Sequence, residues 1–126
     1  MKINYPTSWY EQYEIARSDD GLKKALEHSA FEELLAGFAC HGDSLDIGTA
    51  TGRYMRVATE LGFTAFGIDN SIHAVSATRE YISHLGIPTE RVQLMDGADM
   101  DFENERFRLV TCMMSTISHS YDYFAI

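Results

Sequence analysis

The residues best suited to chemistry lie in the stretch 44–54, which reads Ser-Leu-Asp-Ile-Gly-Thr-Ala-Thr-Gly-Arg-Tyr. A short apolar run ends near Asp46, passes through a turn of small residues and opens into a helical pattern. This order is typical of a strand that presents its carboxyl end to a ligand. Gly48 and Gly52 allow backbone angles that other residues adopt only with strain, and they leave room for a ligand against the main chain. We therefore interpret residues 48–52 as a cofactor loop.

Small residues fill the middle of the cofactor loop. The small side chains of Thr49, Ala50 and Thr51 let a ligand approach the loop backbone closely. The first N–H groups of the following helix lack partners within that helix. Such amides give a weakly positive surface that is rich in hydrogen-bond donors. The loop is therefore predicted to suit a ligand with a carboxylate or a phosphate.

A second acid stands where the next predicted strand ends. Asp69 follows the glycine turn by roughly 20 residues, a spacing at which a carboxylate can accept hydrogen bonds from both hydroxyls of an adenosine ribose. Its alternative role is to cap the helix that begins after Ser71. We expect Asp69, together with the neighbouring Asn70, to bind the ribose.

Acidic and small residues also follow the third predicted strand. A carboxylate in this position can accept a hydrogen bond from the exocyclic amine of adenine, while a backbone N–H donates to a ring nitrogen. Ile72, Met100 or Phe102 could line the apolar slot that the ring needs. We call residues 96–101 the acidic segment.

Strands and helices must alternate to bring these sites together. Apolar runs predict strands over residues 44–47, 63–68, 91–95 and 107–114. Before the first strand, helical signals predict an aromatic helix over 9–17, a helix that begins near Leu22 and another that begins at a capping box over 29–32. Between the later strands they predict a helix over 53–61, which Gly62 ends, and a helix from Ser71 to Gly86. We expect the last of these helices to be lined on one side by Ile72, Val75, Ile82 and Leu85.

The predicted elements form a single domain over residues 1–126, with a helical lead-in over 1–43 and the core over 44–126. The aromatic helix of the lead-in can pack onto the core. It can instead act as a lid over the cofactor, in which Tyr13 and Arg17 meet a carboxylate from one helix face.

Composition favours one soluble domain. The chain has 126 residues, of which 45% are hydrophobic, and a net charge of -9 at pH 7 with a pI of about 4.8. That charge would repel a phosphate backbone or an anionic membrane, so we expect neither nucleic acid nor a membrane as a partner. The first residues lack the layout of a signal peptide, which predicts a cytoplasmic protein. Cys40 and Cys112 lie far apart in the sequence, so no metal site is predicted.

The pattern Asp46-x-Gly48-x-x-x-Gly52 resembles motif I of the class I S-adenosylmethionine-dependent methyltransferases, written (D/E)-x-G-x-G-x-G. It departs from that motif at Ala50, which stands where the family has its second glycine. The dinucleotide fingerprint G-x-G-x-x-G fits less well, because Ala50 and Arg53 occupy its second and third glycine positions.

Three further signals follow in the family's order: Asp69, the acidic segment and the fourth strand. Residues 107–119 are similar to the segment F-D-x-V-x-C-M-F-S-S-I-G-Y of small-molecule methyltransferases, including N-methyltransferases of amino sugars. Arg108 and His119 depart from the Asp and Tyr of that segment. The resemblance covers residues 13–119 and implies a Rossmann-like, three-layer α/β sandwich.

The resemblance also implies which residues hold S-adenosyl-L-methionine. Residues 46–48 would contact the methionine amino group, Asp69 the ribose, and Asp96-Gly97 the adenine. A second register gives the adenine contact to Asp99-Met100, and both registers remain open. The full predicted cofactor set is Tyr13, Asp46, Gly48, Thr49, Ala50, Gly52, Asp69, Asn70, Asp96, Gly97, Asp99, Met100 and Met113.

The family's sheet has seven strands in the order 3-2-1-4-5-7-6, and this sequence accounts only for the first four. The fourth strand would then lie at an edge of the sheet, where an apolar strand invites pairing with another chain. We therefore expect a homodimer or a swapped assembly through the fourth strand, or a piece of a longer protein.

Three functions follow from these residues. The first is methyl transfer to a small-molecule acceptor, which leaves S-adenosyl-L-homocysteine as product and could use His119 as a base, although a lone histidine is often structural. The second is cofactor binding without turnover, as a sensor or a subunit. The third is a nucleotide-binding oxidoreductase, which Ala50 and Arg53 disfavour.

Overall fold

The computed structural model describes residues 21–112 of the chain, apart from the side chains of residues 21–24, 27 and 28. The aromatic helix predicted over 9–17 lies outside the described residues. The same holds for three predicted site residues, Tyr13, Met113 and His119.

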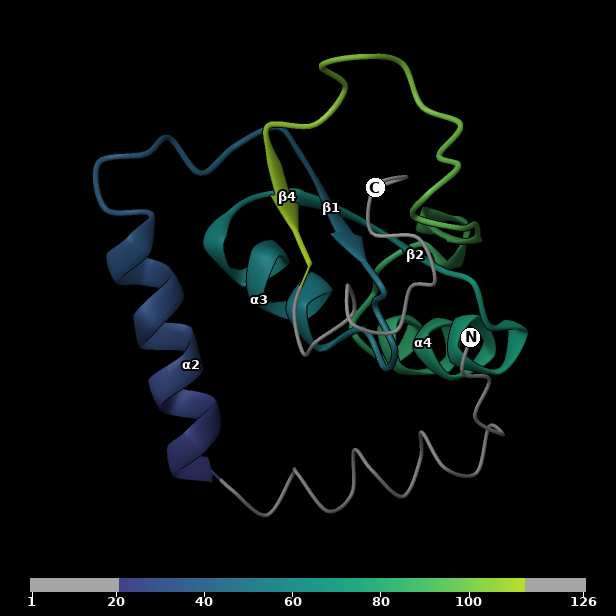
Figure 1. Cartoon of the computed structure of the whole chain (residues 1–126). Coiled ribbons are helices and arrows are strands. Elements are labelled where there is room, and N and C mark those ends of the chain that lie inside the picture. Colours follow the sequence, from purple (N-terminus) through teal and green to yellow (C-terminus); the bar gives the residue numbers. More distant parts are fainter. Residues whose placement is uncertain (1–20, 113–126) are drawn as a thin grey trace.

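Four parallel strands form one sheet in the order β3-β2-β1-β4. The strands are β1 (Asp43–Ile47), β2 (Thr64–Asp69), β3 (Val92–Leu94) and β4 (Leu109–Thr111). In the register of the sheet, Leu45 lies between Phe66 on one side and Val110 on the other. This is the strand order that the sequence predicts, and the two central strands stand at the middle of Figure 1.

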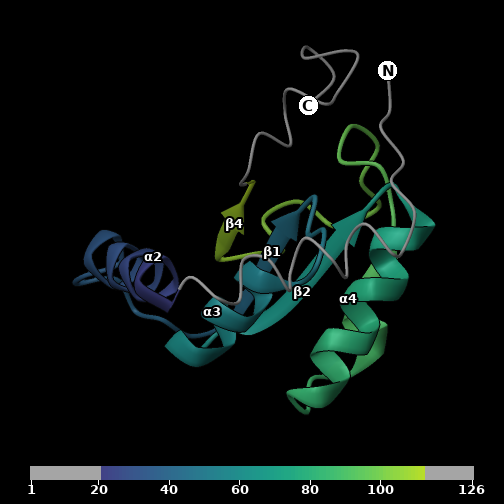
Figure 2. The ribbon, with the colours of Figure 1, turned by 90° about the horizontal axis from the view of Figure 1, so that it is seen from below.

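Two helices cover the same face of the sheet, as Figure 2 shows: α3 (Arg53–Leu61) and α4 (Ile72–His84). Because each connects one parallel strand to the next in the same direction across the sheet, a right-handed crossover places both on one side. The core lies between these helices and the sheet. Its fully buried members include Met55, Ala65, Val75, Ile82 and Val92.

Glycines set the limits of α3, which begins and ends at the predicted residues. Gly52 precedes the helix with φ 87°, and Gly62 follows it with φ 115°. A Cβ atom on Gly62 would lie 2.5 Å from the backbone oxygen of Cys40, so both its conformation and its surroundings require glycine.

The helix α4 begins after Ser71, as predicted, and the Ser71 side chain accepts a hydrogen bond from the Ala74 amide at 3.4 Å. The prediction that Ile72 and Leu85 belong to its buried side is wrong, since they are 53% and 43% exposed. They are the first residue and the C-cap of the helix. The other two residues of the predicted side, Val75 and Ile82, are buried as expected.

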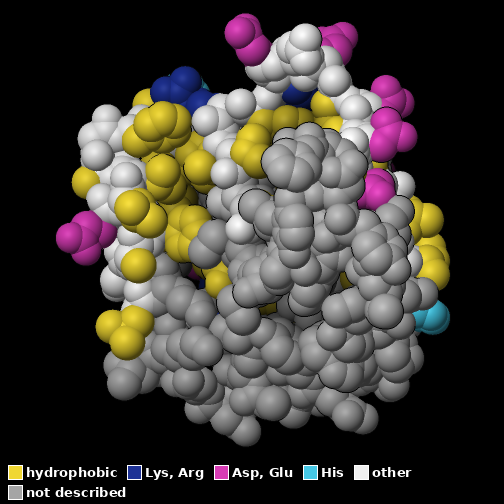
Figure 3. Space-filling view, viewed as in Figure 1, with side chains coloured by type: hydrophobic (Ala, Val, Ile, Leu, Met, Phe, Trp, Pro, Cys, Tyr) yellow, Lys and Arg dark blue, Asp and Glu magenta, His cyan; other side chains and the backbone are white. Residues whose placement is uncertain are grey.

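Within the described residues, one helix, α2 (Gly21–Leu34), precedes the sheet. The prediction of a new helix at a capping box over 29–32 is therefore wrong, because no glycine or proline interrupts the helix there. Phe31 meets Tyr54 of α3 with ring centroids 5.6 Å apart. Leu26 and Leu34 remain 61% and 80% exposed, and Figure 3 shows the hydrophobic side chains on this side of the molecule.

The segment between β3 and β4 crosses the face of the sheet that lies opposite α3 and α4. There Phe107 packs edge-on against Phe66 and Phe102, with centroids 5.9 and 4.9 Å apart. The guanidinium of Arg106 lies over both Phe66 and Phe107 and pairs with the carboxylate of Asp43. These contacts fix the far end of the segment and bring the chain back into β4.

Candidate functional site

The cofactor loop and Asp69 lie side by side at the carboxyl ends of β1 and β2. The amides of Gly48 and Thr49 both donate to the carbonyl oxygen of Ile68, at 2.9 and 3.0 Å. One residue on, the amide of Ala50 donates to Oδ2 of Asp69 at 3.1 Å. The predicted adjacency of the glycine turn and the second acid is therefore confirmed.

The conformation of the loop requires small residues. Gly48, Ala50 and Gly52 all have left-handed backbones, with φ of 73°, 53° and 87°. A Cβ atom on the buried Gly52 would also lie 2.9 Å from Cγ2 of Thr78. Gly48 and Gly52 adopt this conformation without strain, whereas Ala50 does so against the preference of its Cβ atom.

Four amides of the cofactor loop are used in hydrogen bonds inside the protein. Besides the three amides described above, the Gly52 amide donates to the carbonyl of Thr49 at 2.9 Å. An amide has a single hydrogen to donate, so these four donors hold the loop and are not offered to a ligand. The predicted donors are the first amides of α3 (Arg53–Leu61), which these four hydrogen bonds do not involve, so the anion-binding surface stays a prediction.

Asp46 is buried in the sheet with part of its bonding capacity unused. It is 4% exposed, its Oδ1 accepts a hydrogen bond from the Thr111 hydroxyl at 2.8 Å, and its Oδ2 has no partner among residues 21–112. Burial raises the pKa of Asp46 to about 7, against the hydrogen bond from Thr111 and with the charge of Asp69 acting in the same direction as burial. The nearby Thr49 hydroxyl lowers this pKa but makes no hydrogen bond of standard geometry within the described residues.

Asp69 links the cofactor loop to the start of α4, whose N-cap is Ser71, and its contact with ribose stays a prediction. Its Oδ1 accepts from the Ser71 amide at 3.0 Å, next to the start of α4, while its Oδ2 binds the cofactor loop. Burial raises its pKa, and the backbone hydrogen bonds from Ser71, Ala50 and Asn70 oppose that rise. A carboxylate has about four acceptor positions, so capacity for a ribose hydroxyl remains. The adjacent Asn70 is exposed.

The acidic segment joins the same edge at its first residues. The Met95 amide donates to the carbonyl of Asp69 at 2.9 Å, and a Cβ atom on Gly97 would lie 2.9 Å from Cγ2 of Ile47. Asp96 turns the chain by accepting from the Ala98 amide at 2.9 Å. Farther along, Asp99 and Met100 are both exposed, with Met100 at 43%. Asp96 and Gly97 are therefore next to the ends of β1 and β2.

A family model described as a methyltransferase domain matches residues 45–124, more than half of the chain. The chain belongs to this methyltransferase family. A search of curated proteins finds no significant match. Among solved structures, it is similar to the crystal structure of an inferred S-adenosyl-L-methionine-dependent methyltransferase from Methanococcus maripaludis, with 17% identity and a TM-score of 0.71. That match covers 93% of this chain and 55% of the other, so the chain spans about half the length of that protein.

The methyltransferase domain has the class I Rossmann-like fold, as the resemblance of its motifs implies. S-adenosyl-L-methionine is the cofactor that this class uses, and the residues at the strand ends fit it. Asp46 and Asp69 put two carboxyl groups at one edge, and the Asp46 Oδ2 is a buried acceptor with no described partner. Such acceptors suit an ammonium group, a sulfonium charge and ribose hydroxyls, whereas a pyrophosphate would be repelled.

Sequence reasoning missed two threonines of the methyltransferase domain. Thr111 holds Asp46 from β4, and Thr78 of α4 donates to the carbonyl of Ala50 at 2.8 Å. Both contacts join residues far apart in the sequence, so no local motif announces them. The signal for Thr78 was a polar residue at helical spacing between Val75 and Ile82, on the buried side of its helix.

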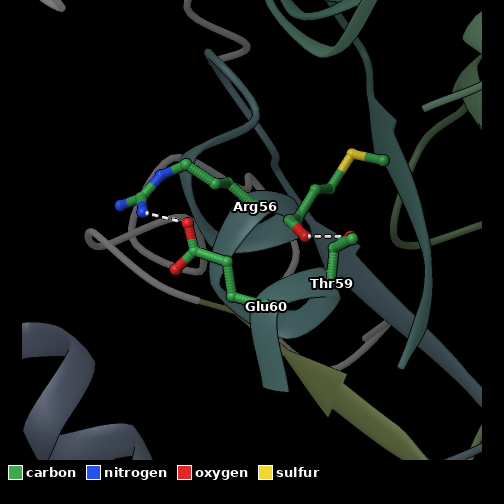
Figure 4. Close-up of polar contacts among 4 residues, drawn as sticks. Arg56, Thr59 and Glu60 are labelled. Carbon is green, nitrogen blue, oxygen red and sulfur yellow. Dashed lines mark hydrogen bonds and ion pairs between the residues drawn. The ribbon is translucent and has the colours of Figure 1, made fainter. Parts of the chain in front are cut away.

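A hollow of about 140 Å³ lies away from the strand ends, between the last turn of α3 and the end of α4. Its wall includes Arg56 and Glu60, which form an ion pair at 2.8 Å, and Thr59, whose hydroxyl donates to the Met55 carbonyl (Figure 4). Since α3 runs from the cofactor loop back to the start of β2, this hollow is at the opposite end of the sheet from the cofactor loop.

The described part of the chain contains no group of three or more His, Cys, Asp or Glu side chains placed to bind a metal ion. Within residues 21–112, no helix has both the length and the apolar character needed to cross a membrane.

Proposed function

We propose that this protein binds S-adenosyl-L-methionine at the carboxyl ends of β1 and β2 and transfers its methyl group to a small-molecule acceptor. One observation carries the proposal: Asp69 accepts the Ala50 amide at 3.1 Å, which places an acid for the ribose against a glycine loop. Belonging to the methyltransferase family supports the same reaction class.

Each part of the edge would hold one part of the cofactor. The Oδ2 of Asp46 would accept from the methionine ammonium, since it is buried and has no described partner. Asp69 would accept from a ribose hydroxyl with the capacity that Ala50 and Ser71 leave free. The contact of Gly97 with Ile47 favours the Asp96-Gly97 register for adenine over Asp99.

S-adenosyl-L-methionine supplies an electrophilic methyl group, so the residues of this chain mainly have to orient it. The carboxylates of Asp46 and Asp69 would oppose the positive charges of the ligand. A cation next to Asp46 favours the ionised carboxylate, and we expect cofactor binding near pH 7 to release a proton from it.

The acceptor class rests on sequence alone. Residues 107–119 resemble small-molecule methyltransferases, and His119 is the proposed base when the acceptor must lose a proton. His119 lies outside the described residues. Binding without turnover is the second candidate, because the chain spans 55% of the solved structure that it matches.

Calorimetry with S-adenosyl-L-homocysteine and with NAD tests the proposal. We expect one equivalent of S-adenosyl-L-homocysteine to bind and NAD to give no heat. Binding of NAD instead would contradict the assignment. A methyl-transfer assay against small amines and alcohols then separates turnover from binding alone, and mass spectrometry of a co-purified ligand gives independent identification.

We further propose that a second copy of the chain pairs with the edge formed by β4. Within the described sheet β4 pairs only with β1, and Val110 on it is 52% exposed. Static light scattering should show a dimer, and Val110→Lys should shift it toward monomer. A monodisperse monomer of the unsubstituted chain would contradict this assembly.

A further inference from the structure

Ala50 occupies a conformation that alanine rarely adopts. Its φ is 53°, in the left-handed region, where the Cβ atom is crowded by the following carbonyl. The methyltransferase motif that the loop resembles has glycine in this position. Some other interaction must therefore stabilise the left-handed alanine at the centre of the cofactor loop.

Three contacts hold Ala50, and they come from two different elements. Its amide donates to Asp69 at the end of β2, and its carbonyl accepts from the hydroxyl of Thr78 on α4 at 2.8 Å. Its side chain packs against Ala74 and Ala77, also on α4. Small side chains on this face of α4 therefore let the loop lie directly on the helix.

Thr78 touches the loop at a second point. Its Cγ2 atom is 2.9 Å from the place that a Cβ atom on Gly52 would occupy. The Thr78 side chain is completely buried, so it acts on the site through the loop. Its hydroxyl therefore binds the middle of the loop, and its methyl group packs against the end of the loop.

We infer that Thr78 is a positioning residue of the cofactor site, whose hydroxyl holds Ala50 in the left-handed conformation and so allows alanine to replace the glycine of the motif. The inference rests on the proposed function, since the loop matters for catalysis only if it holds the cofactor. Removing the hydroxyl releases the Ala50 carbonyl and lets the loop relax toward conformations that alanine prefers.

The test uses the full chain with Thr78→Val, which keeps the side-chain shape but removes the hydroxyl, and calorimetry with S-adenosyl-L-homocysteine. We expect affinity to fall about tenfold, as for a lost hydrogen bond to a part-buried group. Thr78→Ser keeps the hydroxyl, and its affinity should stay within about threefold of the unsubstituted chain. Unchanged affinity in folded Thr78→Val would overturn the inference.

Ala50→Gly distinguishes positioning from a general loss of stability. Glycine adopts a positive φ without help, so Thr78→Val should cost less than about threefold when Gly stands at 50. An equal loss in both backgrounds would overturn the inference. If Thr78→Val fails to fold, Thr78→Ala makes the same comparison with a smaller side chain.

Amide hydrogen exchange without ligand separates failure of the inference from failure of the proposed function. Thr78→Val should speed exchange at the Ala50 amide, and Ala50→Gly should suppress that effect at position 50. If the unsubstituted chain does not bind S-adenosyl-L-homocysteine, the proposed function fails, while this exchange result still decides whether Thr78 positions the loop.

Discussion

Two parts of the same edge are held in different ways. The cofactor loop is tied to two elements: to β2 through the carbonyl of Ile68 and the carboxylate of Asp69, and to α4 through the hydroxyl of Thr78. The acidic segment is held mainly by a local turn at Asp96 and by the contact of Gly97 with β1, and its later residues are exposed. Hydrogen bonds to residues distant in sequence thus hold the cofactor loop, and local hydrogen bonds hold the acidic segment.

This difference indicates that the cofactor loop and the acidic segment respond differently to a ligand. A loop with four amides already used inside the protein has a fixed shape, and the unsatisfied Oδ2 of Asp46 lies on the strand that precedes it. An exposed segment with local contacts can adjust when a ring is inserted. We therefore expect the methionine and ribose side to be preformed and the adenine side to adapt.

The largest predicted effect concerns the buried acid at the preformed part. The pKa of Asp46 is about 7 in the folded chain and 3.8 in the unfolded reference, so only the folded state binds this proton between those values. Stability should therefore fall as pH rises from about 4 to about 7, by up to about 1.4 kcal/mol per pH unit from this group. Denaturant unfolding as a function of pH measures the slope.

Asp46→Asn should make the dependence of the unfolding free energy on pH less steep between about pH 4 and pH 7, because the titrating carboxyl is gone. Asp69, whose pKa is also raised, contributes in the same direction and remains in the variant. Thr111→Val removes a hydrogen bond that lowers the pKa of Asp46, so the fall in stability should extend to higher pH. An identical slope in Asp46→Asn would show that this carboxyl is not the buried titrating group.

Alanine substitutions of glycine compare the cofactor loop and the acidic segment through the free energy of unfolding. Gly52→Ala should cost about 2 to 4 kcal/mol, because it combines a positive φ with a contact at 2.9 Å to Thr78. Gly97→Ala should cost about 1 to 2 kcal/mol, since it makes a similar contact, at 2.9 Å to Cγ2 of Ile47, without the added strain of a positive φ. Chemical denaturation measures both.

Gly86→Ala is the matched control for backbone strain. It has a φ of 76° and open space around it, so it should cost about 1 kcal/mol through strain alone. If Gly52→Ala lowers the free energy of unfolding no more than Gly86→Ala does, the tight packing of the loop against α4 does not contribute to stability.

The smallest predicted effect separates the two adenine registers. Asp96→Asn should weaken S-adenosyl-L-homocysteine by about 1 kcal/mol, because Asp96 stands next to the strand ends and holds the local turn. Asp99→Asn should change affinity by less than about 0.5 kcal/mol, because the Asp99 side chain is exposed. The reverse ranking in calorimetry would favour the Asp99-Met100 register.

Local signals gave most of the fold correctly. Glycines at 52 and 62 mark α3, and Ser71 marks the start of α4, because each has a backbone or capping requirement that its own residue type meets. The capping pattern over 29–32 misled because the same letters also occur inside a continuous helix. The exposure of Ile72 depends on where the first turn of α4 lies relative to the sheet, which periodicity does not specify.

The candidate site was predictable in outline but not in its internal bonding. Asp69 follows from its place after a strand, and the structure sets it beside the loop. The roles of Thr78 and Thr111 depend on contacts between residues 28 and 65 positions apart. The use of the loop amides inside the protein likewise depends on Ile68 and Asp69 of the neighbouring strand.

One measurement tests the central claim most directly: the affinity of S-adenosyl-L-homocysteine for the unsubstituted chain and for Asp69→Ala, with folding verified by circular dichroism. Asp101→Ala, an exposed acid at the end of the acidic segment, serves as the control. We predict binding to the unsubstituted chain and a loss of about 1.5 to 3 kcal/mol in Asp69→Ala, as expected for hydrogen bonds to a charged group. Equal affinity of a folded Asp69→Ala variant would contradict the ribose site and with it the assignment of this edge.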